Sequence, residues 1–131
     1  MNHTMELFDH TLQTTHLWLK ELMEDLHTEN RHFAYICLRS VLHTLRDRLP
    51  APEAIHLAAQ MPLLLAGILI SGWKIRKKPF RWNKKQFLEH VRESFGTSNN
   101  PGDVERIVRA VFKLLANRMT EGQIEQVIHL L

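Results

Sequence analysis

The sequence predicts an all-α fold of about seven helices, arranged as two similar helical units around one core. Apolar residues recur at spacings of three and four along most of the chain, which is typical of one face of a helix. No segment alternates apolar and polar residues as a half-buried strand does. With 131 residues, of which 44% are hydrophobic and 24% charged, the chain has the length and composition of one globular domain.

The first three helices are predicted from apolar stripes and prolines. A helix over residues 5–27 carries the stripe Phe8, Leu12, Thr15, Leu19, Leu22 and Leu26. A second helix over residues 30–49 carries the stripe Ala34, Cys37, Leu38, Val41, Leu45 and Leu49. Pro50 and Pro52 end it and open a third helix over residues 52–60, because a first turn does not use the N–H that proline lacks.

A fourth helix is predicted from LLLAGILI, residues 63–70, after Pro62. Residues 61–70 are apolar on every side, which favours a buried position between the two units. The segment is too short to cross a bilayer, which needs about 20 residues. We therefore expect Leu64→Asp or Ile68→Asp to prevent folding, because an unpaired buried charge is costly.

The second half is predicted to hold three more helices. Residues 74–82 have no apolar period and are interpreted as a basic linker. Asn83 and Gln86 resemble a capping box that opens the fifth helix. Asn100, Pro101 and Asp103 open the sixth helix, and TEGQ at residues 120–123 repeats the capping-box pattern at the start of the last.

An internal repeat predicts the two units. At an offset of 70, LRSVLHTLRDRLP from Leu38 aligns with VRAVFKLLANRMT from Val108. Apolar and arginine positions pair without a gap, which favours a duplication over a chance match of two amphipathic helices. The first unit is expected over residues 1–73, the linker over 74–82 and the second unit over 83–131, all within one helical domain.

The second unit has no counterpart of the fourth helix. Its last apolar residues, Val127, Ile128, Leu130 and Leu131, are therefore expected to be exposed. Either the fourth helix covers them or they pair with a second chain about a two-fold axis. We favour pairing.

Two motifs point to a known family. AYICLRSVLHTLRDRL, from Ala34 to Leu49, follows the pattern A-Y-x-x-L-R-x-V-L-x-x-L-R-D-R-L. LAAQMP, from Leu57 to Pro62, follows L-x-A-Q-L-P. With these motifs, and with TTHLWLKELMEDL and FLEHVRESF outside them, the chain resembles the bacterial domain-of-unknown-function family numbered 2267 over nearly its whole length. The resemblance implies a small all-helical protein of unknown activity.

The chain departs from this family at two motifs. The family's R-G-x-Y-Y-E-G-W survives only at Gly67, Gly72 and Trp73. Its polar positions are occupied here by Ala66, Leu69, Ile70 and Ser71. The closing L-P-x-x-L-x-x-L-W segment of the family is also missing. A function carried by that polar cluster would be lost in this chain.

Cysteine usage and charge bear on location and partners. Cys37 is the single cysteine and lies on an apolar stripe, so we expect an inert thiol and no internal disulfide. The amino terminus lacks the features of a signal peptide, which favours the cytoplasm.

Residues 1–30 carry six acids and one base, while the remainder carries eight acids and sixteen bases. We expect these two parts to pair with each other rather than to attract an anion.

Metal sites and catalytic sites find little support. Glu24 with His27, and Glu53 with His56, have the E-x-x-H spacing of di-metal sites in helical bundles, but the two further inward glutamates are missing. No glycine-rich phosphate loop and no nucleophile motif occurs. We expect no catalytic residue, no metal, no cofactor and no enzymatic activity.

A basic and aromatic segment at residues 73–85 is the sharpest local feature. Its seven cations are Lys74, Arg76, Lys77, Lys78, Arg81, Lys84 and Lys85. Three aromatic residues, Trp73, Phe80 and Trp82, lie among them. Cations with aromatics suit single-stranded nucleic acid, or an anionic membrane surface. The favoured interpretation is a solvated linker whose aromatics cover the core. A second basic stripe, Arg106, Arg109 and Lys113, is interpreted as a solvated face.

The leading functional hypothesis is a non-enzymatic cytoplasmic helical module that acts through protein contacts, with a protein partner or as a homodimer. The alternative is binding of nucleic acid or another anionic surface through residues 73–85.

Overall fold

Every secondary-structure element in the part that the computed structural model describes, residues 3–97 and 100–119, is a helix. Its helices are α1 (His3–Asp25), α2 (Arg31–Arg48), α3 (Ala51–Ala59), α4 (Leu63–Ile70), α5 (Lys84–Ser94) and α6 (Val104–Arg118). This arrangement confirms the all-α prediction. The seventh helix and the apolar end at Val127–Leu131 lie outside the described residues.

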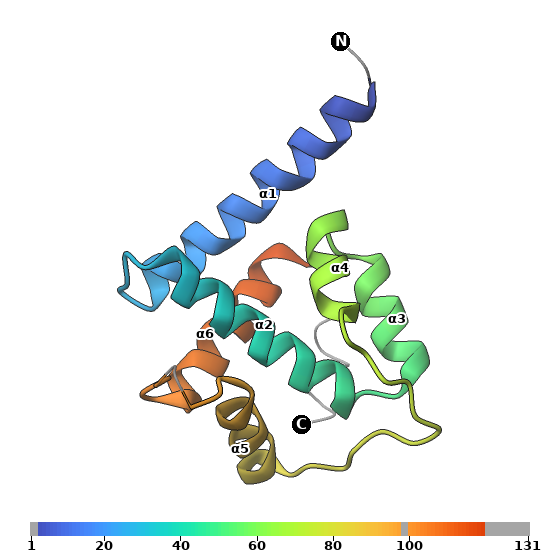
Figure 1. The fold of residues 1–131 in the computed structure, drawn as a ribbon, viewed down its shortest axis with the longest axis vertical. Coiled ribbons are helices and arrows are strands. Elements are labelled where there is room, and N and C mark those ends of the chain that lie inside the picture. The colour runs from blue at the N-terminus through green and yellow to red at the C-terminus, as the bar shows by residue number, and fades with distance from the viewer. Residues whose placement is uncertain (1–2, 98–99, 120–131) are drawn as a thin grey trace.

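Helix α2 is the centre of the fold. It packs against each of the other five helices (Figure 1). Its buried residues are Ala34, Ile36, Cys37, Leu38, Ser40, Val41, Leu42, Thr44, Leu45 and Arg46. The apolar stripe predicted for this helix is buried, and so are residues on either side of it. Buried side chains from all six helices join in one apolar core around α2.

Side-chain caps begin three of the helices. The Asn30 side chain accepts a hydrogen bond from Phe33 N at 3.0 Å, and Asp103 accepts one from Arg106 N. Asn83 and Gln86 form the predicted capping box, in which each side chain accepts from the other's backbone N–H. These short-range bonds satisfy donors that have no partner within the helix.

The structure corrects the end of the first helix. It ends at Asp25 rather than at residue 27, because His27 adopts a left-handed conformation with φ 53°. The N–H of Thr28 then bonds to the carbonyl of Met23 at 3.0 Å, which closes the last turn.

The prediction that residues 61–70 are buried between the two units is wrong. Helix α4 lies on one side of the molecule and packs against α1, α2 and α3 (Figure 1). Leu65 and Leu69 are fully buried, whereas Leu63 is 58% exposed, Leu64 39% and Ile70 48%. LLLAGILI has no polar residue to mark its outer face, so its composition does not show that one side is left uncovered.

The amino-terminal half of α1 is the second correction. Thr15, Trp18, Leu19 and Leu22 are buried, but residues 3–14, here called the arm, project from the body of the protein (Figure 1). Phe8 and Leu12, predicted as core residues, are about half exposed. The stripe is continuous along the helix, but the body of the protein covers only its carboxyl-terminal half.

The repeated segments share some local features. Helices α2 and α6 both end at the paired arginines, Arg48 and Arg118, and an extended residue follows each of them. In the described residues, however, the second unit consists of α5 and α6, against four helices in the first. The duplication therefore stays a prediction.

The run LRDR, residues 45–48 at the end of α2, holds the chain that follows α4. Arg46 is buried, and its Nη1 donates to the carbonyls of Leu69 at 2.9 Å and Ser71 at 3.0 Å. These carbonyls belong to the negative end of the α4 dipole, where a cation is favourable. Asp47 pairs with the same guanidinium at 3.0 Å, so the buried charge is compensated.

Cys37 is buried at the centre of α2, as predicted. Burial raises the pKa of its thiol to about 12, so the thiol stays protonated and unreactive at neutral pH.

Substitution of Leu65 and Leu64 by Asp tests the orientation of α4. Leu65→Asp should abolish a cooperative melt, because it places a charge among fully buried side chains at a cost of several kcal/mol. Leu64→Asp should lower the free energy of unfolding by about 1 kcal/mol or less, because Leu64 faces solvent. Circular dichroism melts compare the two. Equal damage from both would contradict the exposed outer face of α4.

Substitution of Arg46 by Met tests its role as the support of α4. The change removes both donors and leaves the Leu69 and Ser71 carbonyls unpaired, so we expect a loss of about 2–4 kcal/mol in urea denaturation. Lys74→Met is the control, since Lys74 is exposed, and it should stay within about 0.5 kcal/mol of the parent. Similar stabilities for the two variants would show that Arg46 is dispensable.

Candidate interaction surfaces

The basic segment passes from α4 to α5 around the carboxyl-terminal end of α2 (Figure 1). Two hydrogen bonds tie it to α2. Phe80 N donates to the carbonyl of Asp47 at 3.2 Å, and Arg48 Nε donates to the carbonyl of Trp82 at 3.0 Å. The segment is therefore anchored to the body of the protein near its carboxyl-terminal end.

Protein groups already occupy the aromatic rings of this segment. Trp82 stacks on Phe80 with ring centroids 4.7 Å apart, and on His90 at 3.9 Å. Arg76 lies over the Phe80 ring at 4.5 Å. Trp73 and Trp82 are partly buried and pack against the core. The aromatics thus cover the core and one another, which removes the stacking platform that single-stranded nucleic acid requires.

All seven predicted cations of the segment are exposed. Lys84 forms an ion pair with Glu105 at 2.7 Å, and Arg76 is engaged with Phe80. Among the described residues, the remaining five have no acidic partner: Lys74, Lys77, Lys78, Arg81 and Lys85. The segment keeps its positive charge but not its free aromatic faces.

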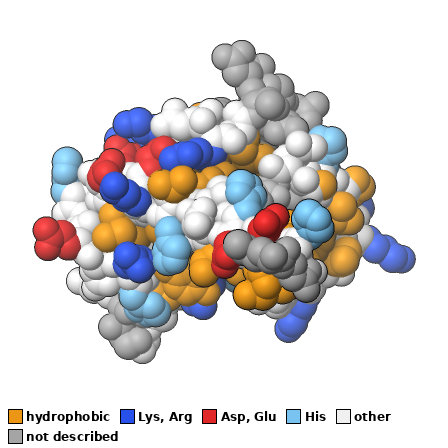
Figure 2. All heavy atoms as spheres, turned by 90° about the horizontal axis from the view of Figure 1, so that it is seen from above, with side chains coloured by type: hydrophobic (Ala, Val, Ile, Leu, Met, Phe, Trp, Pro, Cys, Tyr) orange, Lys and Arg blue, Asp and Glu red, His pale blue; other side chains and the backbone are white. Residues whose placement is uncertain are grey.

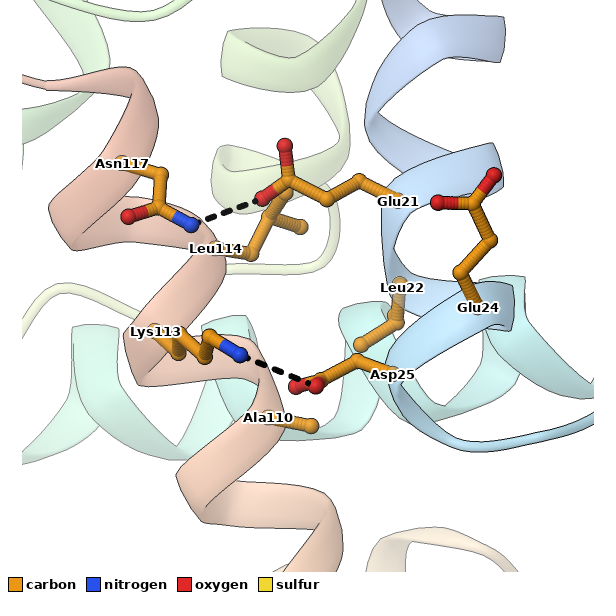
Figure 3. Close-up of a pocket in the computed structure, with 8 residues that line it drawn as sticks. All are labelled: Glu21, Leu22, Glu24, Asp25, Ala110, Lys113, Leu114 and Asn117. Atoms are coloured by element: carbon orange, nitrogen blue, oxygen red, sulfur yellow. Dashed lines mark hydrogen bonds and ion pairs between the residues drawn. The ribbon is translucent and has the colours of Figure 1, made fainter.

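The second basic stripe, on α6, is only partly paired with α1: Lys113 pairs with it, while Arg109 pairs with Glu105 of its own helix at 2.9 Å. Figure 3 shows Lys113 Nζ reaching Asp25 at 3.2 Å and Asn117 donating to Glu21 at 3.2 Å. Arg118 also pairs with Glu21, at 3.0 Å. A shallow cleft of about 230 Å³ between the two helices is lined by Glu21, Asp25, Lys113 and Asn117, among others. The acidic first helix therefore neutralises part of the basic body, as the charge distribution predicted.

The structure brings no metal-binding group together in the part of the chain that it describes. No three His, Cys, Asp or Glu side chains there lie close enough to hold an ion. Glu24 lines the α1–α6 cleft, while His27 lies in the turn beyond α1.

An apolar groove lies between the arm, α2 and α4, and sequence reasoning missed it. Its volume is about 610 Å³, within the range of ligand sites and helix-binding grooves. The apolar side chains that line it are Phe8, Leu12, Tyr35, Leu63, Leu64 and Ile68. Thr11 joins two of its walls, because its Oγ1 accepts a hydrogen bond from Leu64 N at 2.9 Å.

Two polar side chains of α2, Arg39 and His43, also line this groove. Arg39 is partly buried and lies over the Tyr35 ring at 5.7 Å. No acidic side chain pairs with it within residues 3–97 and 100–119. His43 Nε2 bonds to the Ile68 carbonyl at 2.7 Å. Burial lowers the pKa of His43 below its usual 6.5, and so do Arg46 and Arg39. The groove therefore holds one uncompensated cation and a neutral imidazole at neutral pH.

A second apolar groove lies on the other side of α4. Its volume is about 780 Å³, and it is lined by Ile55, Met61, Leu63, Ile70, Trp73 and Ile75, among others. Leu63 lines both grooves, so apolar surface runs around the outer face of α4. Figure 2, seen from the side of the arm's free end, shows apolar side chains open on this face of the molecule.

None of the described helices is long and apolar enough to cross a bilayer. The chain was compared with known proteins, and no curated protein matches it. A family of uncharacterized conserved proteins, DUF2267, matches over residues 15–131. The match covers the helices around α2 and leaves out the arm. This chain belongs to the DUF2267 family of uncharacterized conserved proteins.

Proposed function

We propose that the protein is a non-enzymatic cytoplasmic helical module that acts through protein contacts. The contact surface is the apolar face, defined here as Met5, Phe8 and Leu12 of the arm with Leu63 and Leu64 of α4. One observation carries the proposal. The apolar stripe on the buried second half of α1 continues along the arm, where Met5, Phe8 and Leu12 stay about half exposed although α4 lies beside Thr11.

Exposure of the arm's apolar side chains to water is unfavourable in free energy when no partner covers them. Its residues are exposed except Thr11 and Thr14, which are half-buried. A helix of roughly three turns with so little support is marginal in water, because tertiary packing supplies most helical stability. Met5, Phe8 and Leu12 each expose 48–54% of their surface. Apolar side chains gathered on one face favour a protein interface.

The side chains around the apolar face favour binding over catalysis. His43 Nε2 donates to the Ile68 carbonyl, and burial lowers the pKa of His43, so the ring is not a general acid at neutral pH. Cys37 is buried, and its thiol has a pKa of about 12. The buried thiol supplies no nucleophile, and the neutral imidazole supplies no general acid, to the groove.

Photo-crosslinking in cells of the source organism tests this proposal. A benzophenone side chain replaces Leu64 on the apolar face, or Glu89 on the exposed side of α5 as the control. We expect polypeptide adducts from position 64 at several times the yield from position 89, with mass spectrometry identifying the partner. Equal yields from both positions would overturn a dedicated contact surface on α4.

A second candidate function is binding of an anionic surface through the basic segment. It is favoured by the five exposed cations without an acidic partner, Lys74, Lys77, Lys78, Arg81 and Lys85. With the aromatic rings engaged elsewhere, such binding would depend on charge alone and show no preference for single strands.

A salt-dependent binding assay measures this second candidate. Single-stranded and duplex nucleic acid of equal length should bind with similar affinity, and binding should fall steeply with salt. Lys77→Glu with Lys78→Glu should weaken binding roughly tenfold or more. The matched control is Arg31→Glu with Arg92→Glu, which reverses two exposed charges elsewhere. An equal loss in the control, or no binding at low salt, would exclude the basic segment as the site.

A further inference from the structure

We infer that the partner on the apolar face is a second copy of the chain, and that each copy lays its arm in the groove between α1, α2 and α4 of the other. A carboxylate of the incoming arm, Asp9, then faces Arg39. This inference rests on the proposed function and names the occupant of its surface.

The groove defines the chemistry of its occupant. Its walls are apolar, so the occupant presents apolar side chains. Arg39 is partly buried and has no acidic partner among the described residues, so the occupant also presents an anion. One face of the Arg39 guanidinium lies over the Tyr35 ring. Its N–H groups can still donate to a carboxylate that approaches from the groove. His43, neutral and bonded to Ile68, does not repel such an anion.

The arm has this chemistry. Residues 3–14 contain two acids, Glu6 and Asp9, and no lysine or arginine. Asp9 follows Met5 by four residues, so it borders the stripe formed by Met5, Phe8 and Leu12. Glu6 lies near His3 at 3.6 Å, whereas no basic side chain pairs with Asp9 in the described part of the chain. The unpaired acid of the arm and the unpaired base of the groove are complementary.

Two-fold symmetry allows both copies to make the contact at once. Phe8 and Leu12 belong to the arm and also line the groove, so ridge and groove lie on one face of the chain. A face that carries both is self-complementary, as an isologous dimer interface requires. When each arm lies in the groove of the other copy, the apolar stripes of both arms and the outer faces of both α4 helices are covered.

The family comparison supports a separate role for the arm. The DUF2267 match begins at residue 15, and the buried stripe of α1 also begins at Thr15. The shared helical domain therefore does not use the arm for its core. The apolar residues of the arm are free for another partner, and the groove beside them has an apolar lining and an unpaired cation, Arg39.

Sedimentation equilibrium of the full chain at micromolar concentration tests the exchange. We expect a dimer, and we expect Arg39→Glu or Asp9→Arg to raise the dissociation constant by roughly tenfold or more, because each change places like charges together. The double variant, with Asp9→Arg and Arg39→Glu, should recover most of the affinity. Arg31→Glu, an exposed charge reversal on the same helix as Arg39, should leave the dimer unchanged.

Circular dichroism shows whether each variant folds, and Arg39→Gln replaces Arg39→Glu if the latter does not. Any of three results overturns this dimer: a strict monomer, a dimer whose dissociation constant no change at Asp9 or Arg39 raises, or a double variant that dissociates as readily as the single variants. The crosslinking yields from positions 64 and 89 separate this failure from that of the proposed function. A monomer that crosslinks through position 64 to a different protein keeps the contact surface and replaces the second copy as its occupant.

Discussion

Burial of α2 is the interaction on which the rest of the structure depends. This helix contacts each of the other five, and buried residues point from nearly all its sides. A helix surrounded in this way leaves its neighbours as a single shell, each with one face inward and one face outward. That geometry explains why α4 has an exposed side despite its composition, because it packs on α2 as the other shell helices do.

The polar end of α2 determines the path of the chain after α4. Arg46 donates to the Leu69 and Ser71 carbonyls, the Asp47 carbonyl accepts from Phe80 N, and Arg48 donates to the Trp82 carbonyl. These four hydrogen bonds hold residues 71–82 around the end of the helix. They also bring Trp82 onto His90 of α5. The LRDR run is therefore a structural clamp, and its arginines are not free to bind a ligand.

The two ends of α1 differ in how far their charges and apolar side chains are paired with the rest of the protein. The acids Glu21 and Asp25, at its carboxyl-terminal end, pair with α6 and help fix the helix against the body. Such exposed pairs contribute modestly, roughly 0.2–1 kcal/mol each. At the amino-terminal end, Asp9 and the stripe of Met5, Phe8 and Leu12 have no such partner within the described chain. The same helix thus packs into the domain at one end and leaves its apolar stripe half exposed at the other.

The sequence by itself determined the local features of this protein. Helix starts at Asn30, Asn83 and Asp103 follow from caps that act over three residues, and the stripe of α2 follows from helical spacing. The outward side of α4 was decided only by the tertiary structure, because the apolar run LLLAGILI reads alike on every face. The exposure of the arm and the groove at Arg39 were decided there too, since both depend on which helices lie beside α1. Periodicity shows that a face is apolar, but only the packing of distant segments shows whether anything covers it.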